Sequence, residues 1–322
     1  MNCPHCQGEA KKCGKNRNGS QRYVCDACKK KFTDETTRPA DRREVPRDKA
    51  IMVLRMLLEG SSVRSTERLT GVHRDTILAL LVDAGMACDR LLDRLVVNLP
   101  VEDVQADEIW SFVKCKEKTR LLKNYPEWVG DSWCFVAMER TSKIILAWHM
   151  DRRTPEATRC FANKLRKATA GRFQLSTDGF RPYRTAIWDT FGPDIDFGQL
   201  VKVYGNPPEG GAQARYSPGE VIGAEPTVII GNPDDDKICT SHSERQNLSM
   251  RMTLRRLTRL TNAHSKKSTN HYAALALYFA FFNFCRDHET LHRNAKAKCT
   301  PAMAAGLTDH VWSVGELLAN AV

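Results

Sequence analysis

The stretch VEDVQADEIWSFVKCK, residues 101–116, decides the fold, because here the apolar residues change from helical spacing to the spacing of a strand. Two more strand-like runs follow, DSWCFVAMER at 131–140 and KIILAWHMD at 143–151. The short turn between these two runs predicts a hairpin. The sequence therefore predicts that a sheet begins at residue 101.

Helices and strands alternate after this hairpin. A helix is predicted over 154–171, a strand over 172–179, a helix over 181–192 and a strand over 196–205. Three strands followed by helix, strand, helix and strand is the order of the ribonuclease-H-like fold. We therefore expect an α/β catalytic domain with a mixed sheet over 101–262.

Three acidic residues fall on separate segments of this domain. Asp107 lies on the first strand, Asp178 follows the fourth strand, and Glu244 lies in the basic, helix-like run SERQNLSMRMTLRRLTRL. Carboxylates that meet from distant segments can bind two hard divalent cations, which together clamp a phosphodiester during in-line displacement. The pattern predicts phosphoryl transfer on nucleic acid.

The stretch 205–240, before the helix of Glu244, is rich in glycine and proline and predicts an insertion or an extended β-hairpin. Its three consecutive aspartates, 234–236, offer competing carboxylates. Asp236 therefore remains an alternative to Glu244 as the third metal ligand.

Two Cys-x2-Cys pairs near the N-terminus, with eighteen residues between them, match a four-thiolate zinc site. The predicted Zn²⁺ ligands are Cys3, Cys6, Cys25 and Cys28. Cys13 and His5 are excluded, since Cys13 lies in a polar loop and has no partner two or three residues away. A small module of this kind, residues 1–36, needs the metal for its stability.

Residues 45–85 predict a helix-turn-helix domain, with a break at Gly71 and a second helix that begins near His73. A plain three-helix bundle has the same periodicity. Residues 86–100 predict a further amphipathic helix that serves as a linker or in dimerisation, and 263–322 predict a C-terminal helical region. The side chains expected to contact DNA are Arg64, Arg68, His73, Arg74, Lys29, Lys30, Lys31, Arg255, Arg256 and Arg259.

The charge of the chain favours a polyanionic partner. The net charge is +11, and two stretches are strongly basic, 1–49 with 13 Lys/Arg against 7 Asp/Glu and 240–299 with 11 against 3. The polar N-terminus lacks a signal-peptide core, so the twelve cysteines indicate a reducing compartment, and we expect a cytoplasmic protein near the nucleoid. The longest apolar run, 272–285, is too short to span a membrane and contains Asn283, so it predicts a buried helix.

Together these motifs resemble a known family. The DE-x-W at Asp107, the STDGFRPY run at 176–183 and the ER-x-N-x3-R pattern from Glu244 to Arg251, behind a four-cysteine ribbon and a helix-turn-helix, resemble the transposases of the insertion sequence one family, which are DDE-type recombinases. The resemblance implies that Asp107, Asp178 and Glu244 are catalytic and hold two Mg²⁺, with Mn²⁺ able to substitute. Arg251 would act from the same helix face as Glu244.

The resemblance also implies partners: the terminal inverted repeats of a mobile element, a target DNA, and further copies of the chain in a homodimer or larger assembly. Two other functions fit the same residues. One is a metal-dependent nuclease of the same fold that does not join strands, and the other is a non-enzymatic DNA-binding regulator. Arg286, His288 and His292 are expected to cap a buried helix, with DNA contact as the alternative.

Overall fold

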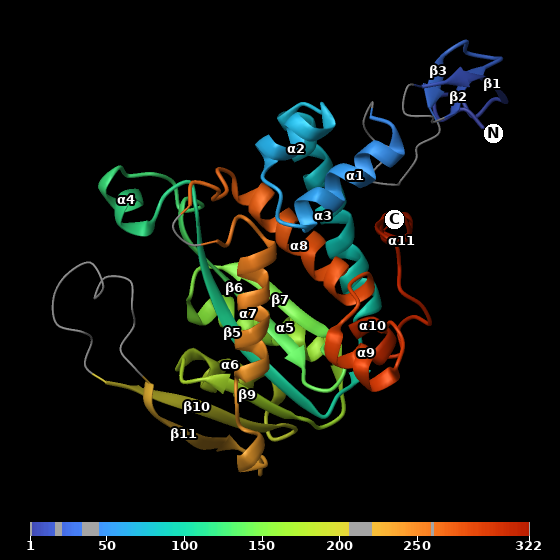
Figure 1. Cartoon of the computed structure of the whole chain (residues 1–322). Coiled ribbons are helices and arrows are strands. Elements are labelled where there is room, and N and C mark those ends of the chain that lie inside the picture. The colour runs from blue at the N-terminus through green and yellow to red at the C-terminus, as the bar shows by residue number, and fades with distance from the viewer. Residues whose placement is uncertain (1, 17–20, 34–44, 206–220, 259–260, 322) are drawn as a thin grey trace.

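We analysed a computed structural model, which describes residues 2–16, 21–33, 45–205, 221–258 and 261–321. The chain is an α/β protein built around a six-stranded mixed sheet with the strand order β11-β10-β9-β5-β6-β7 (Figure 1). The strands of this sheet are β5 (Asp103–Val113), β6 (Gly130–Glu139), β7 (Ile145–Asp151), β9 (Gln174–Asp178), β10 (Asp196–Tyr204) and β11 (Val221–Ile230).

The pairing of the strands follows from their order in the chain. β5, β6 and β7 form an antiparallel meander, whereas β9 runs parallel to β5 and β10 runs parallel to β9. β11 returns antiparallel to β10, so the two strands pair as in an extended hairpin, one of the alternatives expected for 205–240, and residues 206–220 lie outside the described residues. The strands and helices predicted over 101–205 are present in the predicted order, but the structure adds a short helix at 117–122 and a two-residue strand at 169–170.

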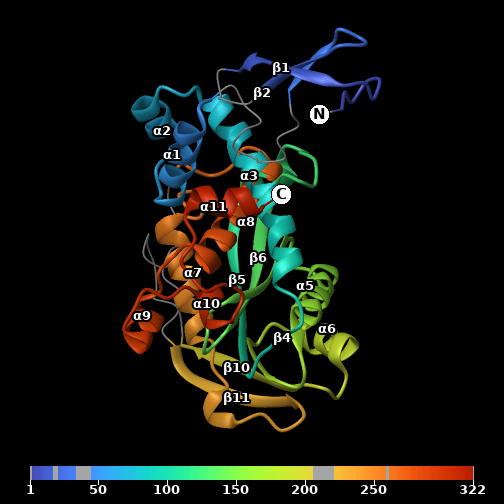
Figure 2. The same ribbon diagram turned by 90° about the vertical axis from the view of Figure 1, so that its right-hand side faces the viewer.

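Helices cover both faces of the sheet (Figure 2). α5 (Pro155–Ala168) and α6 (Pro182–Phe191) pack on one face, and α7 (Ser241–Thr253) and α8 (Ser268–Phe284) lie on the other. α8 is the predicted buried helix, and its Asn283 amide satisfies both backbone groups of Ile145 on the edge strand β7, at 2.9 and 3.0 Å. Within the described part of the chain, no helix combines the length and apolarity needed to cross a bilayer.

The predicted helix-turn-helix segment contains α1 (Arg47–Leu58), α2 (Val63–Thr70) and α3 (Arg74–Leu95). Ser62 caps the start of α2 through a bond from the Ser65 backbone N–H, and α2 ends at Gly71, whose positive φ of 67° suits glycine. The turn predicted at Gly71 is therefore present.

The separate helix predicted over 86–100 is wrong, because α3 continues unbroken to Leu95 and the chain then enters the short strand β4 (Leu99–Pro100). Gly85, the last residue of the predicted helix-turn-helix domain, lies inside α3. A Cβ at this position would approach the Ala273 carbonyl oxygen to 2.2 Å. The glycine allows close contact with α8 instead of breaking the helix, and burial outweighs its low helix propensity.

The remaining elements lie at the two ends of the chain and in short links between the larger elements. The N-terminal module is a three-stranded sheet of β1 (Ala10–Lys15), β2 (Gln21–Cys25) and β3 (Lys31–Thr33). In the described part of 263–322 the chain forms α8 and shorter helices. The shorter elements are α4 (Glu117–Leu122), β8 (Thr169–Ala170), the 3-10 helix η2 (Asp235–Lys237), α9 (Glu289–Ala295), α10 (Pro301–Ala304) and α11 (Val314–Asn320).

Candidate active site and metal centres

The register of two parallel strands brings Asp107 and Asp178 together. Ala106 on β5 pairs with Thr177 on β9, so the next residue along each strand is one of the two aspartates. An oxygen of Asp107, one of Asp178 and one of Glu108 all lie within 4.8 Å of one another. The structure thus brings two of the predicted acids into one carboxylate cluster.

Glu108 completes this cluster, although the sequence did not single it out. Its side chain is only 1 % exposed, and one carboxylate oxygen has no hydrogen-bond partner among the described residues. Burial, together with the charge of Asp178, raises the pKa of Glu108 to about 8. The Tyr183 hydroxyl lies beside this carboxyl, outside hydrogen-bond geometry. A buried carboxyl with a free oxygen could supply a further ligand to a cation in this cluster.

Arg153 bridges two of the three acids. Its guanidinium lies 3.2 Å from Glu108 Oε2 and 3.3 Å from Asp178 Oδ2. It also stacks over the Phe180 ring, 3.9 Å from the ring centre. The position of Arg153 is set by its place just before the Thr154 cap of α5. It gives the cluster a fixed positive charge on one side.

Glu244 lies in the first turn of α7 and lines the same pocket as Asp107 and Asp178, a cavity of about 650 Å³. Its Oε1 accepts hydrogen bonds from Thr240, at 2.7 Å, and from Lys202 on β10. Burial acts to raise the pKa of Glu244, but these two bonds outweigh it and the pKa is lowered. Glu244 is therefore ionised in this pocket at neutral pH.

Asp236, the alternative third ligand, is exposed on η2 and does not belong to the described lining of this pocket. Its backbone N–H bonds to the Asp234 carboxylate, 3.2 Å away, as part of a turn. The geometry favours Glu244 over Asp236.

The electrostatics of Asp107 reflect its crowded position. Burial, Asp178 and Glu244 together raise the pKa of Asp107 to about 6. Its Oδ2 accepts a 2.8 Å hydrogen bond from Asn247 Nδ2, one turn after Glu244 on α7. Asn247 falls inside the quoted motif, but no role was predicted for it. A bound divalent cation would favour the ionised form of Asp107, since it offsets this repulsion.

Arg251, predicted to act beside Glu244, does not belong to the described lining of the pocket. Its guanidinium donates a 3.3 Å hydrogen bond to the Leu257 carbonyl, beyond the end of α7. Arg286 and His288 lie in the link between α8 and α9, and His292 pairs with Asp287 at 2.6 Å. These three are also outside the described pocket lining.

The donors of the acidic cluster suit a hard cation. They are carboxylate oxygens, which Mg²⁺ and similar ions prefer, and two ligands of one Mg²⁺ lie within roughly 4.2 Å of each other. The carboxylate oxygens of the cluster all lie within 4.8 Å of one another. The cluster is therefore compatible with metal binding.

The four predicted zinc ligands form a second cluster at the N-terminus. The sulfur atoms of Cys3, Cys6, Cys25 and Cys28 all lie within 4.8 Å of one another. The Sγ–Sγ distances are 3.7 Å for Cys3 and Cys28 and 3.4 Å for Cys6 and Cys25, near the roughly 3.8 Å edge of a tetrahedron with 2.3 Å Zn–S bonds. Among the described residues, Cys13 and His5 stay outside this cluster.

The residues after the second cysteine of each pair, Gln7 and Lys29, have positive φ angles of 60° and 58°. Each pair thus turns sharply in the same way. Backbone N–H groups also point at two of the sulfur atoms, from His5 to Cys3 and from Cys28 to Cys25. These features fit two matching turns around one metal ion.

The side chains predicted to contact DNA fall into two groups. Exposed surface positions are occupied by Lys29, Lys30, Lys31, Arg68, His73 and Arg74. His73 also caps α3, where its Nδ1 accepts from the Asp75 backbone N–H at 3.3 Å. Arg64, Arg255 and Arg256 line a separate cavity between α2 and the turn after α7. Arg259 lies outside the described residues.

A search of protein-family models finds none that matches this chain. Its function is therefore inferred from the two clusters and from the charge around them.

Proposed function

We propose that this chain is a DDE-type DNA transposase with a ribonuclease-H-like catalytic domain, which cleaves and joins DNA strands by metal-dependent phosphoryl transfer. The observation that supports this most is the convergence of three acids, from β5, β9 and α7, on one pocket. Asp107 and Glu244 are far apart in the sequence, and only the fold brings them together.

In this proposal Asp107 and Asp178 are ligands of two Mg²⁺ ions, for which Mn²⁺ can substitute, and Glu244 supplies the third carboxylate. Ions bound there would activate a water or a 3′-hydroxyl and stabilise the leaving oxygen. Asn247 orients the Asp107 carboxylate, and Thr240 orients that of Glu244. Lys202 and Arg153, at the wall of the pocket, balance part of the negative charge.

The geometry leaves two acids for the role of third ligand. Glu108 is in the tight cluster, whereas Glu244 lines the open pocket. A Mn²⁺ titration monitored by electron paramagnetic resonance distinguishes the roles of these two acids. We expect Glu244→Gln to weaken binding of one Mn²⁺ and Glu108→Gln to leave both sites in place. The reverse result would assign the third ligand to Glu108.

The proposal gives the N-terminal half the task of DNA binding. Zn²⁺ would hold the four-cysteine module together, and α2 and α3 would place Arg68 and Arg74 against the duplex, at the terminal repeats of a mobile element. The enzyme would act as a homodimer or larger assembly, because two DNA ends need two active sites. One equivalent of zinc per chain, lost in Cys25→Ser, is the expected result of metal analysis.

A plasmid integration assay tests the proposed activity. Donor DNA that carries the element ends should be cleaved and joined to a target plasmid in Mg²⁺. Cleavage without joining would show the nuclease, and DNA binding without cleavage would show the regulator.

A further inference from the structure

A second cavity, of about 580 Å³, lies where the helix-turn-helix segment meets the catalytic domain. We call it the junction pocket. Its wall combines the start of α2, the turn after α7, the 262–266 loop and the start of α8. Four Lys and Arg side chains line it, and no Asp or Glu is found in its described lining. The four are Arg64, Arg255, Arg256 and Lys266.

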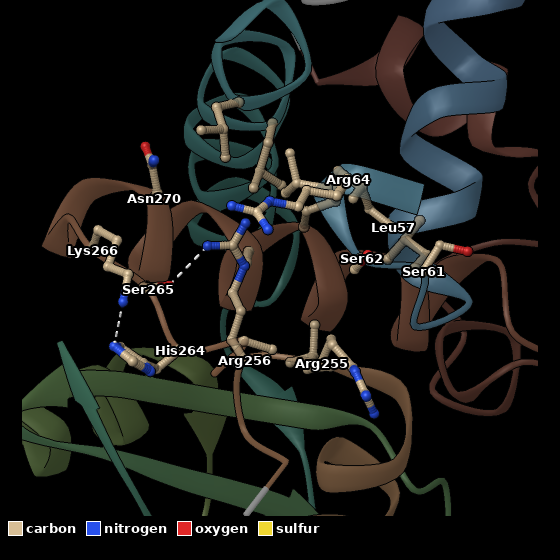
Figure 3. Close-up of a pocket in the computed structure, with 18 of the residues that line it drawn as sticks. Leu57, Ser61, Ser62, Arg64, Arg255, Arg256, His264, Ser265, Lys266 and Asn270 are labelled. Atoms are coloured by element: carbon tan, nitrogen blue, oxygen red, sulfur yellow. Dashed lines mark hydrogen bonds between the residues drawn. The ribbon is translucent and has the colours of Figure 1, made fainter. Parts of the chain in front are cut away.

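Two of these cations converge on the pocket from opposite sides. Figure 3 shows the guanidinium of Arg64, from α2, and that of Arg256, from the turn after α7, both directed into the cavity, whereas Arg255 points away from them. Arg64 is exposed and Arg256 is partly buried. The pocket thus combines one exposed positive charge with one that is partly buried and hydrogen-bonded.

Arg256 is held by a chain of hydrogen bonds through the protein interior. Its Nη1 donates to Ser265 Oγ at 2.8 Å, Ser265 Oγ lies 3.3 Å from His271 Nδ1, and His271 Nε2 lies 2.8 Å from Ser111 Oγ. The Ser111 hydroxyl donates in turn to the Ser132 carbonyl on β6. Burial lowers the pKa of His271 to about 3, so this residue stays neutral.

This network fixes Arg256 without neutralising it. None of its members carries a negative charge, and no carboxylate of the described residues lies within ion-pair distance of the Arg256 guanidinium. Loss of surrounding water lowers the pKa of Arg256 to about 10, so the group remains charged at neutral pH. A partly desolvated cation without a counter-charge costs free energy, and an anion in the pocket would remove that cost.

From this geometry we infer that the junction pocket binds a backbone phosphate of DNA, held between the Arg256 and Arg64 guanidinium groups. Both side chains offer the planar fork that fits phosphate oxygens. Arg64 lies one helical turn before the exposed Arg68, so a strand that contacts α2 can continue into the pocket. This inference rests on the proposed function only in that both require DNA as the ligand.

The salt dependence of DNA binding tests the inference, with a short mixed-sequence duplex, the full chain and no divalent metal. Each lost phosphate contact should reduce the slope of log K against log salt by about 0.9. We expect this loss in Arg256→Gln and in Arg64→Gln. Arg159→Gln removes the same charge from the distant, exposed face of α5 and should leave the slope unchanged.

Arg64→Gln keeps the test valid if Arg256→Gln fails to fold, since Arg64 is exposed. Slopes for both variants equal to that of Arg159→Gln would overturn the inference. A second outcome would also overturn it. Inorganic phosphate would raise the Tm of the wild type but not of Arg256→Gln, while the salt dependence of DNA binding stayed the same in both. The pocket would then bind a free anion and not DNA. Complete lack of DNA binding would overturn the proposed function as well, whereas lack of cleavage alone would leave this inference intact.

Discussion

The acidic pocket and the junction pocket carry opposite charges, yet both depend on strand β5. Asp107 faces the acidic pocket, and Ser111, four residues later on the same face of the strand, starts the network that holds Arg256. In the acidic pocket Arg153 and Lys202 already balance part of the charge, whereas no described acid balances Arg256. One rigid strand can therefore present a cation site and an anion site at a fixed separation.

The largest effect is expected from removal of an acid. Asp178→Ala should reduce metal-dependent DNA cleavage at least about a thousandfold, because several kcal/mol of transition-state stabilisation are lost with a metal ligand. Cleavage of an end-labelled duplex measures this. Asp236→Ala, which removes an exposed carboxylate from η2, should retain activity. Equal losses of cleavage in both variants would mean that the acids of the pocket are no more important than an exposed acid.

Asn247→Ala should have a smaller effect on the same pocket. The variant loses the 2.8 Å hydrogen bond that orients Asp107, and loss of such an orienting bond lowers metal affinity by about 10- to 100-fold. Titration with Mn²⁺ measures the change. Ser249→Ala serves as the control: it lies on the same helix, and its hydroxyl donates a 3.1 Å hydrogen bond to the Arg245 carbonyl, away from Asp107. Equal Mn²⁺ affinity in the two variants would remove Asn247 from the site.

Gly85→Ala should disturb the side of the molecule that contains the junction pocket. The new Cβ would overlap the Ala273 carbonyl, so we expect a loss of about 1–3 kcal/mol in the free energy of unfolding from forced separation of α3 and α8. The gain of about 1 kcal/mol that alanine brings to a helix offsets only part of this loss over most of that range. Urea unfolding checks it, and a variant as stable as the wild type would show that the two helices are not tightly packed.

His271, which helps to hold Arg256 through Ser265, should make the stability of the protein depend on pH. Its folded pKa of about 3 lies below the ordinary value of about 6.5, so the unfolded chain binds the proton more tightly. The stability that neutral His271 contributes is complete above pH 6.5 and is lost as the pH falls toward 3, by about 1.4 kcal/mol per pH unit.

Urea unfolding of the wild type and of His271→Asn at a series of pH values measures this dependence. The difference in stability between the two proteins should shrink from pH 7 to pH 4. A constant difference would mean that His271 is not buried in its neutral form.

Most of the sheet and two of its acids could be predicted from sequence. The apolar periodicity of the strands is visible in the runs 101–116, 131–140 and 143–151 themselves. Residues at the ends of neighbouring parallel strands lie close together independently of the loops that connect the strands. The continuity of α3 could not be predicted, because the signal at Gly85 is local whereas its cause, contact with Ala273, is not.

The finer parts of both pockets depend on contacts between distant segments. The adjacent Glu108 joins the cluster only because β9 ends beside it, and Ser111 meets His271 across 160 residues of sequence. Asn247 and Arg256 lie in sequence runs that the motifs already contain. Their hydrogen bonds to Asp107 and Ser265 could not be predicted, because the fold determines them. Residue type and spacing therefore predicted Asp107, Asp178 and Glu244, whereas packing added Glu108 and determined the hydrogen-bond partners of these acids.

The most direct test of the metal site is anomalous diffraction from crystals of the protein grown with DNA and Mn²⁺. Peaks are predicted between the Asp107 and Asp178 carboxylates, at roughly 2.1 Å from their oxygens, next to a DNA phosphate. Mn²⁺ peaks confined to other parts of the surface, with DNA bound away from this pocket, would contradict the account.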